Sequence, residues 1–109
     1  MITIKYRPKS RVLTMQGHAD AGEKGHDIVC AAASMVFYNL CQMLLEYDQD
    51  KAFAKPTVLQ DKPGSARLEV TPKTGYETWI DHDMLYALTG FRMLMQKYPD
   101  YVNLIVLKK

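Results

Sequence analysis

The sequence predicts an α+β fold, in which a mixed or antiparallel sheet of about five strands packs with two helices in the order ββαββαβ. Three observations predict this fold. Short segments of alternating apolar and polar residues come in pairs, two long segments repeat apolar residues at helical spacing, and turn-forming residues separate the segments. With 109 residues the chain has the size of one domain, so we expect a single domain over residues 1–109.

The strands are predicted from alternation. In the first segment Ile2, Ile4 and Tyr6 alternate with polar residues, which is typical of a strand with one buried face. Turns at Pro8-Lys9-Ser10 and Lys62-Pro63-Gly64 join two pairs of segments as hairpins. The predicted strands are residues 1–6, 11–17, 57–60, 66–71 and 101–107.

Two helices are predicted, one that follows Asp27 and continues to about Tyr47, and one over residues 78–98. Asp27 is a good N-cap residue, and its carboxylate is expected to accept from the backbone N–H of Val29 or Cys30. The first helix is apolar nearly all round, which indicates burial by the sheet and by a second subunit. Residues 48–55 after it are predicted to form a polar connector.

Composition and charge give no support for a nucleic-acid partner, a membrane span or a signal peptide. The net charge of +2 is too weak to argue for a nucleic-acid partner, and the basic run of the first hairpin is typical of a solvated sheet edge. The run consists of Lys5, Arg7, Lys9 and Arg11. The apolar stretch 28–45 contains Ser34, Asn39 and Gln42, so we predict no membrane span, and no N-terminal stretch resembles a signal peptide.

The two cysteines, Cys30 and Cys41, are predicted to lie on one helix. Their separation of about 16 Å along the helix axis exceeds the roughly 7 Å that a disulfide can bridge between Cα atoms. Two reduced cysteines are expected in a cytoplasmic protein. Cys41 lies in mid-helix and is predicted to be a core residue.

The residues that carry chemistry gather between Gly17 and Ser34. Cys30 falls in the first turn of the predicted helix, where free N–H groups and the helix dipole favour a thiolate and can hold an oxyanion. His18 precedes it by twelve residues, across a loop that contains Gly22 and Gly25 and can fold the imidazole back onto the sulfur. The alternative is structural, because a cysteine on an apolar helix is usually a small buried hydrophobe.

The neighbouring polar residues each have two interpretations. Asp27 is either a helix cap or an orienter of His18, and we favour the cap. Ser34 either reaches the rim of a site or donates back to the carbonyl of Cys30. His26 is interpreted as a solvated loop residue rather than a base or substrate contact.

A metal site is the weaker interpretation of the same residues. His18, His26 and Cys30 offer three ligands, with His82 or Asp20 as a fourth. No Cys-x-x-Cys or His-x-x-x-His spacing supports such a site, so we expect no metal and no other cofactor.

The segments Gly17-His18-Ala19 and Gly25-His26-Asp27-Ile28-Val29-Cys30-Ala31, followed by Ser34, resemble the signature of the ribosomal-processing cysteine protease family, Prp. The resemblance implies a small α+β homodimer that removes a short N-terminal extension from a large-subunit ribosomal protein. The cut would fall after an aromatic residue and before a small one.

By the same resemblance Cys30 is the nucleophile, and His18 is the general base and later the general acid. The N–H of Cys30 or Ala31 would stabilise the oxyanion, and residues 19–25 would form a flap with Gly17 as its hinge. Asp27 and Ser34 match further positions of the motif. The dimer face, or a surface of Met35, Met43 and Phe37, would supply an apolar groove for the aromatic residue.

Two other functions stay open at this point. The basic hairpin fits a non-catalytic module that associates with the ribosome or with RNA. A low-pKa thiol at Cys30 fits a structural or redox-sensing dimer. Only the peptidase requires His18 for turnover.

Overall fold

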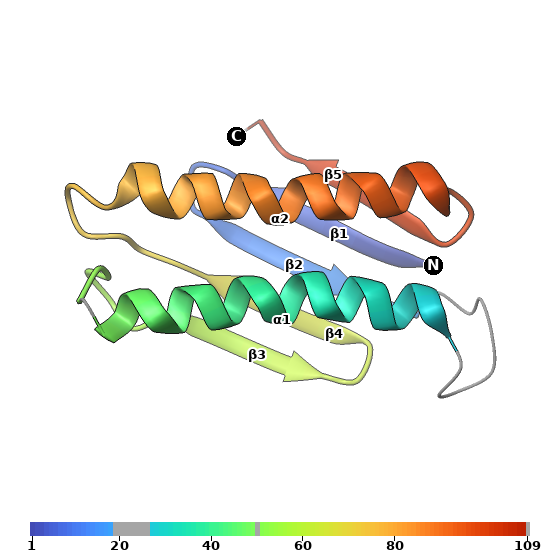
Figure 1. Cartoon of the computed structure of the whole chain (residues 1–109), viewed down its shortest axis with the longest axis horizontal. Coiled ribbons are helices and arrows are strands. Elements are labelled where there is room, and N and C mark those ends of the chain that lie inside the picture. Colours follow the sequence, from blue (N-terminus) through green and yellow to red (C-terminus); the bar gives the residue numbers. More distant parts are fainter. Residues whose placement is uncertain (19–26, 50, 109) are drawn as a thin grey trace.

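The computed structural model describes residues 1–18, 27–49 and 51–108. Its elements follow the predicted order, and the predicted α+β class with a mixed sheet is confirmed (Figure 1). The elements are β1 (Ile2–Arg7), β2 (Val12–Gln16), α1 (Ile28–Gln49), β3 (Val58–Lys62), β4 (Ser65–Glu69), α2 (Glu77–Lys97) and β5 (Val102–Val106).

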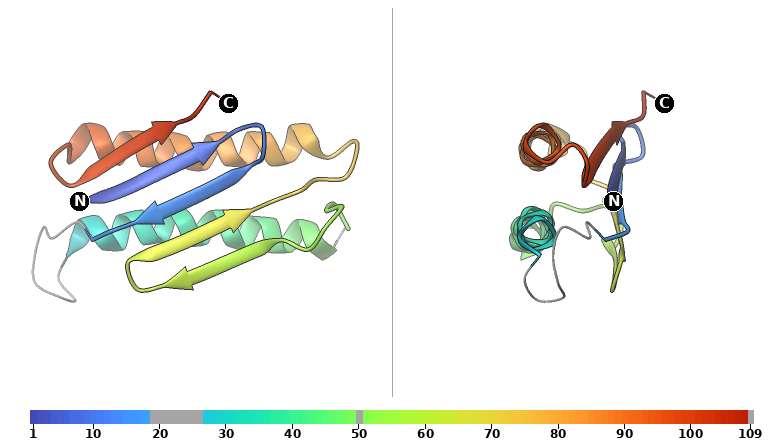
Figure 2. Two further views of the ribbon diagram at one scale, coloured as in Figure 1. Left: turned by 180° about the vertical axis from the view of Figure 1, so that it is seen from behind. Right: turned by 90° about the vertical axis from the view of Figure 1, so that its right-hand side faces the viewer.

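The molecule has two layers, because both helices cover the same face of the sheet (Figure 2). The strand order is β3-β4-β2-β1-β5, with β1 and β5 parallel and the other neighbours antiparallel. On β1 the alternating side chains Ile2, Ile4 and Tyr6 are buried beneath the helices, as their spacing predicts. Pairing of the first strand with the last ties the two ends of the chain into one sheet.

Each helix buries one stripe of apolar side chains on the sheet. The stripe of α1 includes Val29, Ala33, Phe37, Leu40 and Leu44, and that of α2 includes Ile80, Met84, Ala87, Leu88 and Phe91. By length and composition α1 is apolar enough to cross a membrane, a property that core helices of globular proteins share. Here its stripe is covered by the sheet, which accounts for much of its apolar character.

Local predictions differ from the structure in several places, and most element ends shift by one or two residues. The connector after α1 is only partly polar, because Phe53 packs into the core and forms an isolated bridge with Pro72. The second strand begins at Val12 rather than Arg11, since Arg11 takes a positive φ of 52°. Its guanidinium donates to both carboxylate oxygens of Asp81 on α2, at 2.6 and 2.9 Å.

The expected surface of Met35, Met43 and Phe37 does not form. Phe37 is 1% exposed in the core, whereas Met35 is 67% exposed on another face of the same helix. Helical spacing allows several faces when nearly every position is apolar, so the sequence alone did not separate the inner face from the outer one.

Candidate active site

A cleft of about 420 Å³ lies between the first half of α1 and the hairpin of β3 and β4. The start of α1, the end of β2 and the β3–β4 turn meet at the same end of the molecule (Figure 1). Four of the predicted site residues line this cleft, namely Gly17, His18, Cys30 and Ser34. Two other predicted residues, Asp27 and Ala31, do not line the cleft. The remaining predictions fall outside the described residues, namely Gly22, Gly25, His26 and the flap 19–25.

The start of α1 places Cys30 at the cleft. One carboxylate oxygen of Asp27, Oδ1, accepts from the backbone N–H of Val29 and of Cys30, each at 3.0 Å. This confirms the predicted cap and makes Cys30 the third residue of the helix. The partial positive charge at this end of a helix favours a thiolate over a thiol.

The cap also engages the N–H groups that were expected to hold an oxyanion. The N–H of Cys30 donates to the Asp27 carboxylate, and the N–H of Ala31 donates to the Asp27 carbonyl at 3.1 Å. An oxyanion at this position must therefore compete with Asp27 for these donors.

Backbone contacts hold the segment that carries His18. Gly17 has a φ of +97°, and its N–H donates to the Gly64 carbonyl at 2.9 Å. The terminal ammonium of Met1 donates to the His18 carbonyl at 2.6 Å. A side chain at Gly17 would collide with the Met1 carbonyl, so this position requires glycine. Gly17 is an anchor in this structure, and its role as a hinge stays a prediction.

Gly64, in the β3–β4 turn, forms the surface against which the His18 imidazole lies. A Cβ atom at Gly64 would lie 2.7 Å from Nε2 and 3.3 Å from Cε1 of His18. The φ of +76° at Gly64 is itself typical of glycine. The sequence predicts a turn here but carries no signal that the turn supports the histidine.

Tyr38 and Asp61 are further cleft residues that the sequence analysis missed. The Tyr38 hydroxyl donates to Oδ2 of Asp61 at 2.8 Å, which joins α1 to β3 across the cleft. This hydrogen bond raises the pKa of Tyr38. Tyr38 follows Cys30 and Ser34 at intervals of four residues, so helical spacing could have placed it on the same face.

Cys41 is buried, as predicted, and the two cysteines, both among the described residues, are not joined by a disulfide. Burial, and then the charge of Asp61, raise the pKa of the Cys41 thiol to about 11. The thiolate is the reactive form, so the raised pKa keeps the Cys41 thiol protonated and unreactive at pH 8.

We therefore expect iodoacetamide at pH 8 to alkylate Cys30 in the folded protein and to leave Cys41 unmodified. Intact mass followed by peptide mapping measures this. The control is the same reaction in guanidinium chloride, where unfolding returns Cys41 to an ordinary pKa and both thiols react. Preferential labelling of Cys41 in the folded protein would contradict the burial seen here.

Among residues 1–18, 27–49 and 51–108, no group of three or more His, Cys, Asp or Glu side chains is arranged to hold a metal ion. The alternative metal site also involves His26 and Asp20, which lie outside these residues. The described part of the cleft offers a thiol, an imidazole and a hydroxyl, a set suited to nucleophilic chemistry.

Comparison with known proteins gives consistent similarities. The family model for the cysteine protease Prp matches residues 1–103. The ribosomal processing cysteine proteases Prp of two Staphylococcus aureus strains, Mu50 and NCTC 8325, are each 54% identical to this chain over 37 residues. That alignment covers 34% of this chain and 35% of each relative, so the chain spans about a third of the length of the curated relatives it matches.

Solved structures share the fold over nearly the whole chain. The ribosomal processing protease Prp from S. aureus, in complex with a covalently linked product peptide, superimposes with a TM-score of 0.79 at 23% identity, covering 98% of this chain and all of that one. A Streptococcus mutans protein superimposes with a TM-score of 0.69 at 22% identity, covering 99% of this chain and 93% of that one.

Proposed function

The chain belongs to the cysteine protease Prp family, and we propose that it is a cysteine endopeptidase with Cys30 as nucleophile and His18 as general base and acid. The observation that supports this proposal is that one cleft contains both side chains. His18 follows β2 and Cys30 lies in α1, and both line the same cavity between α1 and the β3–β4 hairpin. A shared cavity supports the proposal, because a cysteine peptidase needs its thiol and imidazole to meet in space and not in the sequence.

The proposed reaction proceeds through an acyl-enzyme. The Cys30 thiolate attacks the scissile carbonyl, the C–N bond breaks, and protonated His18 gives its proton to the leaving amine. Water then attacks the thioester, His18 accepts its proton, and the thiolate leaves. The covalently linked product peptide of the S. aureus relative supports a covalent mechanism.

The proposed substrate is the N-terminal segment of a large-subunit ribosomal protein, cut after an aromatic residue in the cytoplasm. The names of the S. aureus relatives support ribosomal processing. Beside Cys30 the cleft is lined by Ile2, Met15 and Ala33, and these apolar side chains suit an apolar residue next to the scissile bond.

We also propose that the protein is a homodimer associated through its helix layer. Met35 on α1 and Tyr86 and Met93 on α2 are 67%, 68% and 64% exposed. Exposed apolar side chains of this size, gathered on one layer, are typical of association surfaces. Sedimentation velocity measures the dimer, and a monomer at all concentrations would contradict it.

Peptide cleavage followed by mass spectrometry tests the peptidase. The substrate spans a ribosomal extension that ends in paired aromatic residues followed by Ala, and it is incubated with wild type and with Cys30→Ala. A single cut after the aromatic pair, absent with the variant, is expected. Cleavage by both proteins would remove Cys30 from the mechanism.

Gly64→Ala is predicted to slow catalysis by displacing the His18 imidazole. We expect kcat to fall roughly 10- to 100-fold with little change in KM, since the imidazole acts on the reacting atoms rather than on substrate binding.

The matched control for this prediction is Gly75→Ala. Gly75 also has a positive φ, of +99°, but no heavy atom lies within 4 Å of a Cβ built there. Both variants lose about 1–2 kcal/mol of stability from the left-handed backbone. An equal fall in kcat for the two variants would attribute the effect to stability and contradict the role of Gly64.

The RNA-binding alternative receives less support. Arg11 is one of the four cations of the basic hairpin, and it donates to both carboxylate oxygens of Asp81. The Asp81 carboxylate therefore neutralises the positive charge of Arg11 locally. A redox module would use the same Cys30 thiolate, but it would not require the imidazole that lies in the same cleft.

A further inference from the structure

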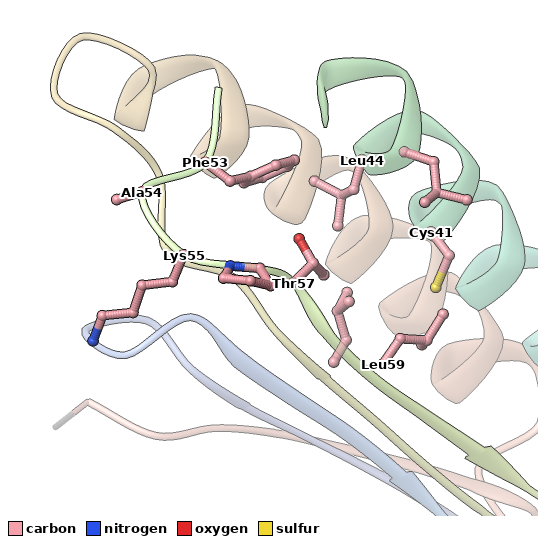
Figure 3. A pocket seen from close by; sticks show the side chains of 10 residues that line it. Cys41, Leu44, Phe53, Ala54, Lys55, Thr57 and Leu59 are labelled. Carbon is pink, nitrogen blue, oxygen red and sulfur yellow. The ribbon is translucent and has the colours of Figure 1, made fainter. Parts of the chain in front are cut away.

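A second cavity, of about 480 Å³, lies between the later half of α1 and the segment that leads into β3. Its lining is largely apolar and includes Cys41, Leu44, Leu45, Phe53, Leu59 and Leu68. Cys41 and Leu44 of α1 lie opposite Thr57 and Leu59, while the Lys55 ammonium points away from them (Figure 3). We call this cavity the distal groove.

The distal groove continues the catalytic cleft along the same helix. Ser34 and Tyr38 of α1 line the cleft, and Cys41 and Leu45 line the groove. Intervals of three or four residues place these side chains along one face of a helix. α1 and β3 lie side by side and run in opposite directions (Figures 1 and 2). Residues of α1 that follow Cys30 therefore lie opposite progressively earlier residues of β3.

The sheet supplies a continuous floor for both cavities. In the β3–β4 pairing Asp61 lies opposite Ala66, and Leu59 lies opposite Leu68. The first pair lines the cleft and the second pair lines the groove. Since residues two apart on a strand face the same side, the two pairs are consecutive inward-facing rows. The cavities are therefore adjoining parts of one trough.

The hydrogen bond between Tyr38 and Asp61 crosses the trough where the two parts meet. Burial and then the Asp61 carboxylate raise the pKa of Cys41 on the groove side, so this charge acts on residues of both cavities. The Tyr38 hydroxyl and the Asp61 carboxylate lie between the half-polar cleft and the largely apolar groove. Polar groups at this point suit a bound peptide, because its amide groups need hydrogen-bond partners.

We propose that the distal groove binds an apolar side chain of the substrate about five residues before the scissile bond. This inference rests on the proposed peptidase function. The rise of a helix separates Cys30 from Cys41 by about 16 Å. An extended peptide advances about 3.3 Å per residue, so about five residues span that distance. We assign the groove to the N-terminal extension that the proposed reaction removes. The extension precedes the folded part of the substrate and can lie extended in the groove, whereas the residues after the cut belong to the folded protein.

The test uses a variant that makes the groove more polar, with a control matched in chemistry and exposure. The groove variant is Leu45→Gln with Leu59→Thr, at side chains 54% and 46% exposed. The control variant is Leu85→Gln with Val58→Thr, at side chains 54% and 41% exposed that do not line the groove. All four positions are exposed, and the replacements suit helix and strand, so both variants are expected to fold.

Two peptides share the same cleavage sequence. The long peptide has about eight residues before the scissile bond, with Leu at the positions that reach the groove, and the short peptide has about three. With wild type we expect kcat/KM to be about tenfold higher for the long peptide. The groove variant is expected to lose that advantage and to cut the short peptide at the wild-type rate, while the control variant behaves like wild type on both.

Several results would overturn the inference. One is a groove variant that keeps the higher kcat/KM of the wild type for the long peptide. Another is a groove variant whose kcat/KM falls by the same factor for both peptides. A groove variant that changes from dimer to monomer in sedimentation would assign the groove to a second copy of the chain. Failure of wild type to cut either peptide would refute the peptidase itself, which separates that failure from a failure of the groove alone.

Discussion

Replacing Cys30 with Ala is expected to lower kcat/KM for the aromatic-ending peptide by at least about 10⁴-fold, the size of effect seen when a covalent nucleophile is removed. In the proposed mechanism the Cys30 thiolate forms the bond to the substrate carbonyl, and no other cysteine lines the described part of the cleft. Cleavage rates measured by liquid chromatography with mass detection, with enzyme in excess for the variant, give the ratio.

The same variant is expected to keep its fold. Cys30 is half-buried, and Ala is the best helix former, so the melting temperature should change by no more than about 3 °C. The Asp27 cap uses backbone N–H groups at Val29 and Cys30, which the substitution retains. Circular dichroism and thermal melting check this. Cleavage by the variant at more than about one hundredth of the wild-type rate would mean that Cys30 is not the nucleophile.

His18→Ala is expected to reduce kcat by about 10²- to 10⁴-fold, which is the range for loss of a general acid–base group. The imidazole lines the same cleft as the thiol. In the proposed mechanism its removal leaves the leaving amine without a proton donor. His18 is exposed, and its segment is held by backbone contacts to Met1 and Gly64, so the substitution should not unfold the chain. Single-turnover kinetics isolate the chemical step.

The control for this variant is His82→Ala. His82 is exposed on α2 and does not line the cleft, so its loss should leave kcat unchanged. Wild-type turnover by His18→Ala would refute the Cys–His mechanism. If Cys30 were nevertheless alkylated normally in that variant, the result would favour the redox alternative, which needs the thiolate and not the imidazole.

Much of the fold follows from local patterns in the sequence. The alternation of Ile2, Ile4 and Tyr6 predicted β1, and all three side chains are buried. Asp27 before an apolar run predicted the cap of α1, and the carboxylate accepts from the two N–H groups expected of it. These features were predictable because a cap or an alternation depends only on residues a few positions apart.

The candidate site was predictable only in part. The motif from Gly17 to Ser34 identified the thiol and the imidazole, and the structure places both in one cleft. The motif did not identify Gly64, which lies against the His18 imidazole. Nor did it identify Asp61, which accepts a hydrogen bond from the Tyr38 hydroxyl. Both belong to the β3–β4 hairpin, which the sequence predicts only as a pair of strands with a turn.

The sequence by itself therefore determined the order of the elements, the start of α1 and the identity of the two chemical groups. The tertiary structure decided which surfaces meet. The Arg11–Asp81 pair joins residues 70 positions apart, and Tyr38–Asp61 joins residues 23 apart. Contacts of this kind depend on strand order, register and the face that each helix buries. Those are set by packing of the whole chain, because nearly every face of α1 is apolar enough to be the buried one.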